Sequence, residues 1–267
     1  MIQIRSLVGI SFEKMTEAFN DAFSDYDIPA KYSSEYLTDL VIRRGYRPDL
    51  AVGAFDDDRL VGFVFNCLDG DAAYNGGTGV VISHRRRGIA RQLMQRSIET
   101  LPVRRYILEV IDTNTRAAAL YRELGFVETR QLQSWKYVAP TLLSVPAQAG
   151  VPVPQLHRLR AWCDMTPSWQ NDVPSIQRAR EPYLILGDAD AGAVVFPSNG
   201  DVALLAVKPE ARHHGRGRAL LAEIAKTVGK PLRIMNVDTR DDGIAEFLAA
   251  CGAKPMVAQL EMACLLG

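Results

Sequence analysis

Residues 80–90 read Val-Val-Ile-Ser-His-Arg-Arg-Arg-Gly-Ile-Ala, and an amphipathic stretch, residues 89–101, continues from them. The apolar residues before the arginines predict a strand over 76–83, and the apolar spacing after Gly88 predicts a helix. A glycine at such a junction lets the backbone approach a ligand closely, and the first N–H groups of a helix attract an anion. The stretch therefore predicts a phosphate-binding turn. An ordinary strand-to-helix turn with solvated arginines is the alternative.

The same pattern occurs again in the second half of the chain. The segment Arg212-His213-His214-Gly215-Arg216-Gly217 aligns with residues 85–90, because Gly215 follows Gly88 by 127 residues. A second pair of glycines, Gly125 and Gly252, is also separated by 127 residues. Two landmarks at one offset indicate a duplication of the whole plan.

The duplication predicts two tandem domains, residues 1–140 and 141–267, joined by the proline-rich stretch 139–156. In the first domain the expected order of elements is α-α-β-β-β-α-β-α-β, a mixed α/β arrangement. Hydrophobic periodicity predicts helices at 11–24, 34–44, 89–101 and 115–124, and strands at 50–55, 60–68, 76–83, 104–111 and after Gly125.

Composition argues against several classes of protein. The 267 residues are 48% apolar and carry 31 basic and 31 acidic side chains, a balance that argues against a nucleic-acid partner or a membrane-surface protein. The four cysteines form no C-x-x-C pair, so we expect neither a metal site nor a disulfide scaffold. Neither a leader after Met1 nor an apolar run of about 18 residues is present, so we expect a cytoplasmic protein without a membrane span.

Two motifs of the first half resemble those of the GNAT N-acetyltransferases. The first is V-x-x-x-x-R-x-x-G-x-[GA], here residues 80–90, and the second is N-x-x-A-x-x-L-Y-x-x-x-G-F, here residues 114–126. The second half repeats the first motif at residues 207–217. The resemblance covers the chain as two tandem GNAT domains, and it implies a mixed-sheet fold and acetyl-CoA as the cofactor.

The resemblance also implies a place for acetyl-CoA in the first copy, between strands 76–83 and 104–111. The pantetheine arm would pair with the backbone of Val80, Val81 and Ile82, and an N–H group near Val80 would polarise the thioester carbonyl. Asn114 would hydrogen-bond the cofactor, with a plain helix N-cap as the alternative. The residues expected around the pyrophosphate, through backbone N–H groups or charge, are Arg85, Arg86, Arg87, Gly88, Ile89, Ala90 and Arg91.

The resemblance assigns Tyr121 as the general acid that protonates the departing thiolate of CoA, a role typically worth roughly 10²–10⁴ in rate. A tyrosine at the edge of an amphipathic core is the alternative. The implied reaction is direct attack of a primary amine of a small molecule on acetyl-CoA, without a covalent enzyme intermediate.

The two copies differ where chemistry is expected. At the offset of 127, Tyr121 corresponds to Leu248, and Asn114 corresponds to Asp241. We therefore expect catalysis in residues 1–140 and a degenerate or regulatory role for residues 141–267. The second copy keeps its own candidate cofactor-binding residues, which are Val207, Arg212, Gly215, Arg216 and Gly217.

Three alternatives about the second copy stay open. Catalysis could lie there instead of in the first copy, or the chain could be a non-catalytic acyl-CoA sensor. The segment Pro167-Ser168-Trp169-Gln170-Asn171 could form a binding lip or a domain interface. His213 and His214 are adjacent on a loop and cannot easily converge on one metal ion, so we expect solvated or phosphate-facing histidines.

The acceptor amine is expected between the first two helices and the middle strands. A carboxylate could hold its ammonium group or accept its proton, and an aromatic ring could form a wall beside it. The candidates are Asp25, Tyr26, Tyr74, Asn75 and Glu109. A helix cap for Asp25 and a salt bridge for Glu109 are the alternatives. A monomer with an internal pseudo-two-fold axis or a homodimer fits a duplicated chain.

Overall fold

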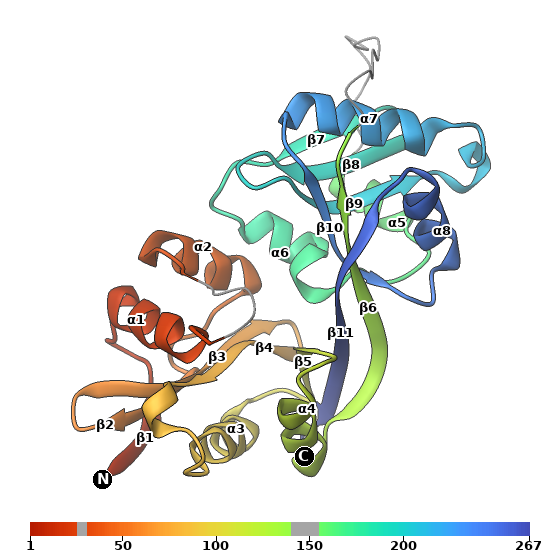
Figure 1. Cartoon of the computed structure of the whole chain (residues 1–267). Helices are drawn as coiled ribbons and strands as arrows, with labels where there is room; N and C mark the ends of the chain where they lie inside the picture. Colours follow the sequence, from red (N-terminus) through yellow and green to blue (C-terminus); the bar gives the residue numbers. More distant parts are fainter. Residues whose placement is uncertain (26–30, 140–154) are drawn as a thin grey trace. The chain divides into compact units, whose positions relative to one another are not determined.

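The computed structural model describes residues 1–25, 31–139 and 155–267 (Figure 1). Its contacts divide the chain into two compact units, Met1–Thr129 with Glu261–Gly267 and Arg130–Leu260. Tyr26 and nearly all of the proline-rich stretch lie outside the described residues. Both units mix helices with parallel and antiparallel strand pairs, so the predicted mixed α/β class is confirmed.

The two units do not coincide with the two sequence copies. Strand β6 (Val127–Tyr137) ends the first copy, yet its residues from Arg130 onward belong to the second unit. Strand β11 (Lys254–Leu265) ends the second copy, yet its residues from Glu261 onward belong to the first unit. The division at residue 140 marks the repeat; it does not mark which sheet the final strand of each copy joins.

The first unit contains four helices and one mixed sheet among its described residues. The helices are α1 (Phe12–Ala22), α2 (Ser34–Arg44), α3 (Ile89–Thr100) and α4 (Thr115–Glu123). Along the sheet, the strands are β1 (Ile2–Ser6), β2 (Val52–Asp56), β3 (Arg59–Asp69), β4 (Ala72–Val80), β5 (Arg105–Ile111) and the end of β11. The predicted hairpin is the antiparallel pair of β2 with β3.

Two details of the first copy differ from the expectation. The sequence analysis missed β1, a five-residue strand that pairs with β2 and is too short to show clear periodicity. The strand predicted over 76–83 ends at Val80, and a 3₁₀ turn (Ile82–His84) follows it. That turn forms because the N–H of His84 donates to the carbonyl oxygen of Val81 at 2.9 Å.

The second unit repeats this plan. Its helices are α5 (Leu156–Ala161), α6 (Val173–Arg178), α7 (Arg216–Val228) and α8 (Asp242–Ala250), with 3₁₀ turns at Trp169–Asn171 and Pro209–Ala211. Its strands run in the order β6, β10 (Leu232–Asp238), β9 (Asp201–Val207), β8 (Ala191–Phe196) and β7 (Leu184–Gly187).

Alternation along β8 explains why this sheet has a core on both faces. Ala193 and Val195 pack with α7 and α8 in one buried cluster. Val194 and Phe196 pack with α5 and α6 in the other. Successive strand residues point to opposite faces, so a fully apolar strand fits a sheet that is covered on both sides.

In each copy, one parallel strand pair is bonded over a short length only. The pairing of β4 with β5 covers Ala72–Tyr74, and that of β9 with β10 covers Asp201 and Val202. The later residues of β4 and β9 therefore keep an edge that is outside this ladder, next to the glycine turns. No helix of the described residues is long and apolar enough to cross a membrane.

Candidate functional site

The two glycine turns share one backbone conformation. Gly88 and Gly215 precede α3 and α7 with φ of 73° and 78°, in the left-handed region that favours glycine. Two residues earlier, Arg86 and His213 also have positive φ, 63° and 62°. Neither helix start has a side-chain cap. The first N–H groups of both helices are thus available to an anionic ligand.

A second glycine keeps the turn of the second copy narrow. A Cβ atom on Gly217 would lie 3.1 Å from Cε2 of Phe247, which is tighter than an ordinary van der Waals contact. Helix α7 therefore approaches α8 closely at this point. The corresponding residue of the first copy is Ala90, which is half-buried.

Arg85 holds the first turn against the end of α1. Its guanidinium group donates to both carboxylate oxygens of Asp25 at 2.6 and 2.9 Å and to the carbonyl oxygen of Ala22 at 2.7 Å. Its Nε atom donates to the carbonyl oxygen of Val80 at 3.3 Å. The hydrogen bond from Arg85 lowers the pKa of Asp25. Two residues predicted for different ligands, the cofactor and the acceptor, thus bind each other.

Arg212 makes the same set of contacts in the second copy. It donates to Asp164 at 2.7 and 3.2 Å, to the carbonyl oxygen of Trp162 at 2.9 Å and, through Nε, to that of Val207 at 3.1 Å. Because the residue after α5 replaces the residue after α1, the clamp was not visible as a match at the offset of 127.

The backbone register identifies which N–H group of the predicted pantetheine strand faces the open edge. Val81 donates its N–H to Val61 at 3.0 Å, and Ile82 donates to Oδ1 of Asp21 at 3.0 Å. In an antiparallel ladder, consecutive residues point their N–H groups to opposite edges. The N–H of Val80 therefore points toward the β5 side, as the N–H of Val207 points toward the β10 side.

The motif on α4 places Asn114 and Tyr121 in different surroundings. Oδ1 of Asn114 accepts a hydrogen bond from the N–H of Ala117 at 3.1 Å, so this side chain caps the helix. Tyr121 is 8% exposed and its ring lies 5.9 Å from that of Phe126. At the corresponding positions of the second copy, Asp241 caps α8 through the N–H of Ile244 and Leu248 is fully buried in the core.

Three of the predicted acceptor residues lie in the interior of the first unit. Tyr74 is 3% exposed, and burial together with Glu109, to which it is hydrogen-bonded, raises its pKa well above its usual range. The guanidinium carbon of Arg44 lies 5.9 Å from the centre of the Tyr74 ring. Asn75 instead bonds within its own strand, to Thr78 at 2.7 Å.

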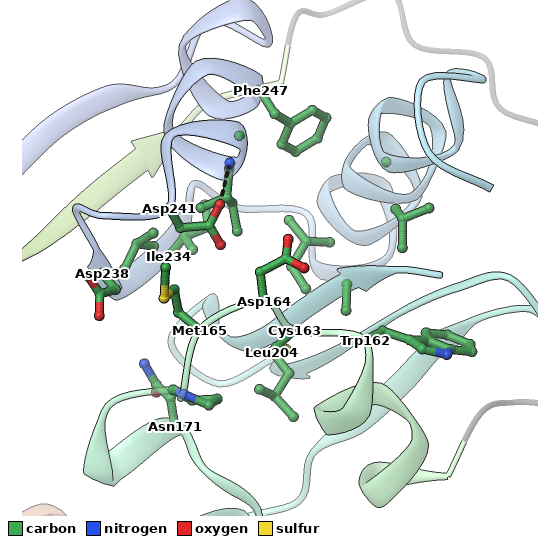
Figure 2. A pocket seen from close by; sticks show the side chains of 18 of the residues that line it. Trp162, Cys163, Asp164, Met165, Asn171, Leu204, Ile234, Asp238, Asp241 and Phe247 are labelled. Atoms are coloured by element: carbon green, nitrogen blue, oxygen red, sulfur yellow. Dashed lines mark hydrogen bonds between the residues drawn. The ribbon is translucent and has the colours of Figure 1, made fainter. Parts of the chain in front are cut away.

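The second unit contains a pocket of about 410 Å³ at its glycine turn (Figure 2). Its walls are the ends of β9 and β10, the turn and the start of α7, the start of α8, and residues 162–168 after α5. The side chains of Asp164 and Asp241 point into it (Figure 2). Of the segment proposed as a lip, Pro167, Ser168 and Asn171 line the pocket, whereas the half-buried Trp169 is absent from the lining.

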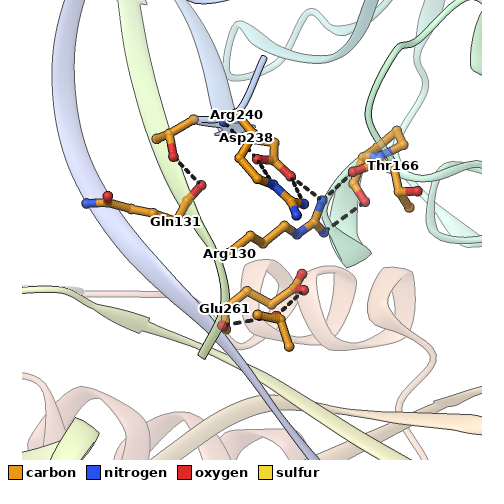
Figure 3. Close-up of polar contacts among 9 residues, drawn as sticks. Arg130, Gln131, Thr166, Asp238, Arg240 and Glu261 are labelled. Carbon is orange, nitrogen blue, oxygen red and sulfur yellow. Dashed lines mark hydrogen bonds and ion pairs between the residues drawn. The ribbon is translucent and has the colours of Figure 1, made fainter. Parts of the chain in front are cut away.

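A buried ion pair fixes one wall of this pocket (Figure 3). Nη1 of Arg130 lies 3.3 Å from Oδ2 of Asp238, and the same guanidinium donates to the carbonyl oxygens of Thr166 and Pro167. Arg240 binds the other side of Asp238 at 2.7 Å. Burial alone would raise the pKa of Asp238, but hydrogen bonds from Arg240 and Arg130 outweigh it, so the pKa is lowered.

Cys163 also lines the pocket, and burial raises its pKa to about 11. It is therefore a neutral thiol near pH 7, which is the unreactive form of cysteine. Among the described residues, no three His, Cys, Asp or Glu side chains come together as metal ligands.

Sequence comparison places the first copy in a known family. Residues 12–126 match the model of the acetyltransferase (GNAT) family. No curated protein matches the chain significantly.

Three solved structures share the fold over nearly the whole chain. A tandem GNAT protein from the clavulanic acid biosynthesis pathway is 14% identical, with a TM-score of 0.73, covering 100% of this chain and 99% of that one. A GCN5-related N-acetyltransferase from Sphaerobacter thermophilus is 15% identical, also with a TM-score of 0.73, covering 99% and 96%. A putative acetyltransferase from Pyrococcus horikoshii is 18% identical, with a TM-score of 0.68, covering 98% and 88%. At these identities the likeness establishes the fold.

Proposed function

Because residues 12–126 form a domain of the GNAT acetyltransferase family and the whole chain has the fold of a tandem GNAT protein, we propose that it transfers an acetyl group from acetyl-CoA to a primary amine of a small molecule. The family uses acetyl-CoA for N-acetylation. The uncapped helix starts behind Gly88 and Gly215 fit that cofactor, because their N–H groups suit a pyrophosphate.

We assign catalysis to the first copy. The observation that carries this assignment is the contrast between Tyr121, an ionisable side chain at the edge of its unit, and Leu248, a buried apolar one. When bound, acetyl-CoA supplies the activated acyl group. The N–H of Val80 stabilises the negative charge that develops on the acyl oxygen.

Protons move at both ends of this reaction. The amine nitrogen forms a bond to the acyl carbon, the carbon–sulfur bond breaks, and Tyr121 gives its proton to the departing sulfur. The proton lost by the amine goes to Glu109, which is hydrogen-bonded to Tyr74. Arg44 lies against the ring of Tyr74, so the carboxylate belongs to a buried polar group rather than to a surface salt bridge.

One observation favours the second copy as the catalytic one. The 410 Å³ pocket lies there and includes Gly215, Arg212 and Val207 among its lining residues. We keep catalysis in the second copy as the second candidate, and its weakness is that Leu248 cannot protonate a thiolate.

Calorimetric titration with acetyl-CoA tests the proposal. Binding lost in a Gly88→Glu variant, with amine turnover lost in Tyr121→Phe, is the expected result. Turnover that survives both changes and disappears in Gly215→Glu would move catalysis to the second copy. The absence of any acetyl-CoA binding by the unmodified chain would overturn the proposal.

A further inference from the structure

The two turns have the same backbone but different charges. At the offset of 127, Arg86 and Arg87 of the first turn become His213 and His214 of the second. All four side chains are exposed, and Arg86 and His213 share the same left-handed backbone conformation. His213 also lines the pocket of the second unit. The position that carries a permanent charge in one copy thus carries a titratable one in the other.

The arginines that remain at the second turn are already paired. Arg212 binds Asp164, and Arg216 binds both Asp188 at 2.7 Å and Asp190 at 3.2 Å on the β7–β8 turn. Arg218 donates to the carbonyl oxygen of Ala250. The charged groups around the two histidines, from every element packed here, are Asp164, Asp188, Asp190, Lys208, Glu210, Arg212, Arg216, Arg218 and Asp241.

In this set the carboxylates outnumber the cations by one while the histidines are neutral. Protonation of both histidines reverses the balance. A histidine side chain gains its charge between about pH 8 and pH 5, so the sign of the local charge depends on pH in the physiological range. The first turn has no such dependence, because its four arginines face only Asp25 and Glu123 as paired carboxylates.

The pocket itself is built for an occupant. Ser168 lines it, is 1% exposed, and its hydroxyl oxygen has no hydrogen-bond partner among the described residues. A buried hydroxyl without a partner is costly unless a ligand or water satisfies it. The apolar side chains Leu204, Ile234 and Phe247 line the same cavity, beside the uncapped start of α7. An extended apolar arm with an anionic pyrophosphate at one end matches this arrangement.

We infer that the second unit is a pH-gated binding site for a CoA ester, which His213 and His214 hold in their protonated form and release when they lose their protons. The inference rests on the proposed function in one respect, the identity of the cofactor. The first copy binds the same cofactor with an affinity that does not depend on histidine protonation. The second site therefore fills as the pH falls and leaves turnover to the first copy.

Titration calorimetry with dephospho-CoA tests the inference on the full chain. This probe lacks the 3′-phosphate, so its remaining pyrophosphate keeps a constant charge. At about pH 8 we expect one site per chain, and at about pH 5.5 a second site, with an affinity for that site about tenfold higher than at pH 8. A Gly88→Glu variant removes the first site and leaves the second to be measured alone.

Matched variants isolate the histidines. The double variant His213→Arg with His214→Arg should bind at both pH values, as the first turn does. The double variant His213→Gln with His214→Gln should bind weakly at both. Both pairs of positions are exposed, so circular dichroism should show an unchanged fold.

Each outcome separates this inference from the proposed function. Two sites with no dependence on pH, or a pH dependence that persists in the Gln variant, would overturn the inference and leave the proposed function intact. A single site at every pH would overturn it in the same way. Loss of all binding by the unmodified chain would overturn the proposed function first, whatever the histidines do.

Discussion

Arg85 and Arg212, 127 residues apart, make one and the same set of contacts in the two copies. Each donates through Nε to the carbonyl oxygen of the valine that ends the strand, and through Nη2 to a carbonyl oxygen at the end of the preceding helix. Each also binds an aspartate that follows this helix. The arginine of the family motif therefore acts here as a clamp between the acceptor-side helix and the glycine turn.

The clamp predicts that Arg85→Ala raises the KM for acetyl-CoA by about tenfold, while kcat falls less. Without the guanidinium group, the turn loses charged hydrogen bonds of the kind that are each worth about 1.5–3 kcal/mol when partly shielded, and Val80 is no longer held in place. Steady-state kinetics with varied acetyl-CoA measure the effect. Arg85→Lys should recover little, since an ammonium group cannot bind Asp25, Ala22 and Val80 at once.

Arg212→Ala is the matched control for this prediction. If catalysis lies in the first copy, this variant should keep the KM of the unmodified chain and lose only ligand binding in the second unit. An equal rise in KM from both variants would contradict the clamp as a local device.

Tyr121→Phe should lower kcat by about 10²–10³ with KM nearly unchanged, because only the proton donor is removed. The ring that packs beside Phe126 stays in place, so the thermal midpoint should hardly move. A pre-steady-state or steady-state assay with a reactive amine reports kcat. Tyr183→Phe in the second unit is the control, and a loss of similar size there would point to a general effect of removing a hydroxyl.

The sequence was sufficient for features that depend on local pattern. Gly88, Gly215 and the helices that follow them were predictable, because a left-handed residue before an amphipathic segment leaves a direct trace in the sequence. The helix cap at Asn114 was foreseen as the alternative to cofactor binding, and its side chain does cap α4.

Features that depend on long-range pairing were not predictable. Asp25 binds Arg85 across 60 residues, and Arg130 reaches Asp238 across 108, so no spacing rule connects them. The pocket of the second unit escaped for the same reason, because Trp162, Met165 and Asn171 belong to a segment with no periodic pattern. The final strands also gave no sign of which unit they join, since a strand's sequence does not identify its neighbour.

Acid unfolding should begin with Asp238. Hydrogen bonds from Arg240 and Arg130 lower its pKa in the folded state, so the folded form favours the carboxylate more than the unfolded form does. The stabilisation is complete above the unfolded pKa of about 4 and is lost as the pH falls through the lower folded value. Urea unfolding at pH 7, compared with pH 3, should show this loss.

Asp238→Asn should remove that dependence on pH and lower the free energy of unfolding at pH 7 by about 3 kcal/mol, as expected when one partner of a buried ion pair is removed. Asp49→Asn is the exposed control, because Asp49 pairs with Arg47 at the surface. A change of similar size in that control would mean that the pH effect is not specific to the buried pair.

Residues 1–140 alone should not form a stable domain, although they contain the complete motifs of one copy. The first unit includes Glu261–Gly267, and this segment is bonded into it: Oγ1 of Thr129 donates to Oε1 of Glu261 at 2.9 Å, and the N–H of Leu266 donates to the carbonyl oxygen of Arg104 at 2.9 Å. Removing the segment exposes the apolar edge of β5, which favours aggregation.

Expression of three chains measures this dependence: residues 1–140, the full chain, and a fusion in which residues 261–267 follow residue 129 through a short glycine linker. We expect the first to aggregate, and the fusion to regain a cooperative thermal transition and acetyl-CoA binding because it restores the missing strand segment. A folded, acetyl-CoA-binding fragment 1–140 would show that the strand segment from the C-terminus is dispensable. In that event, the sequence repeat alone would define an independent domain.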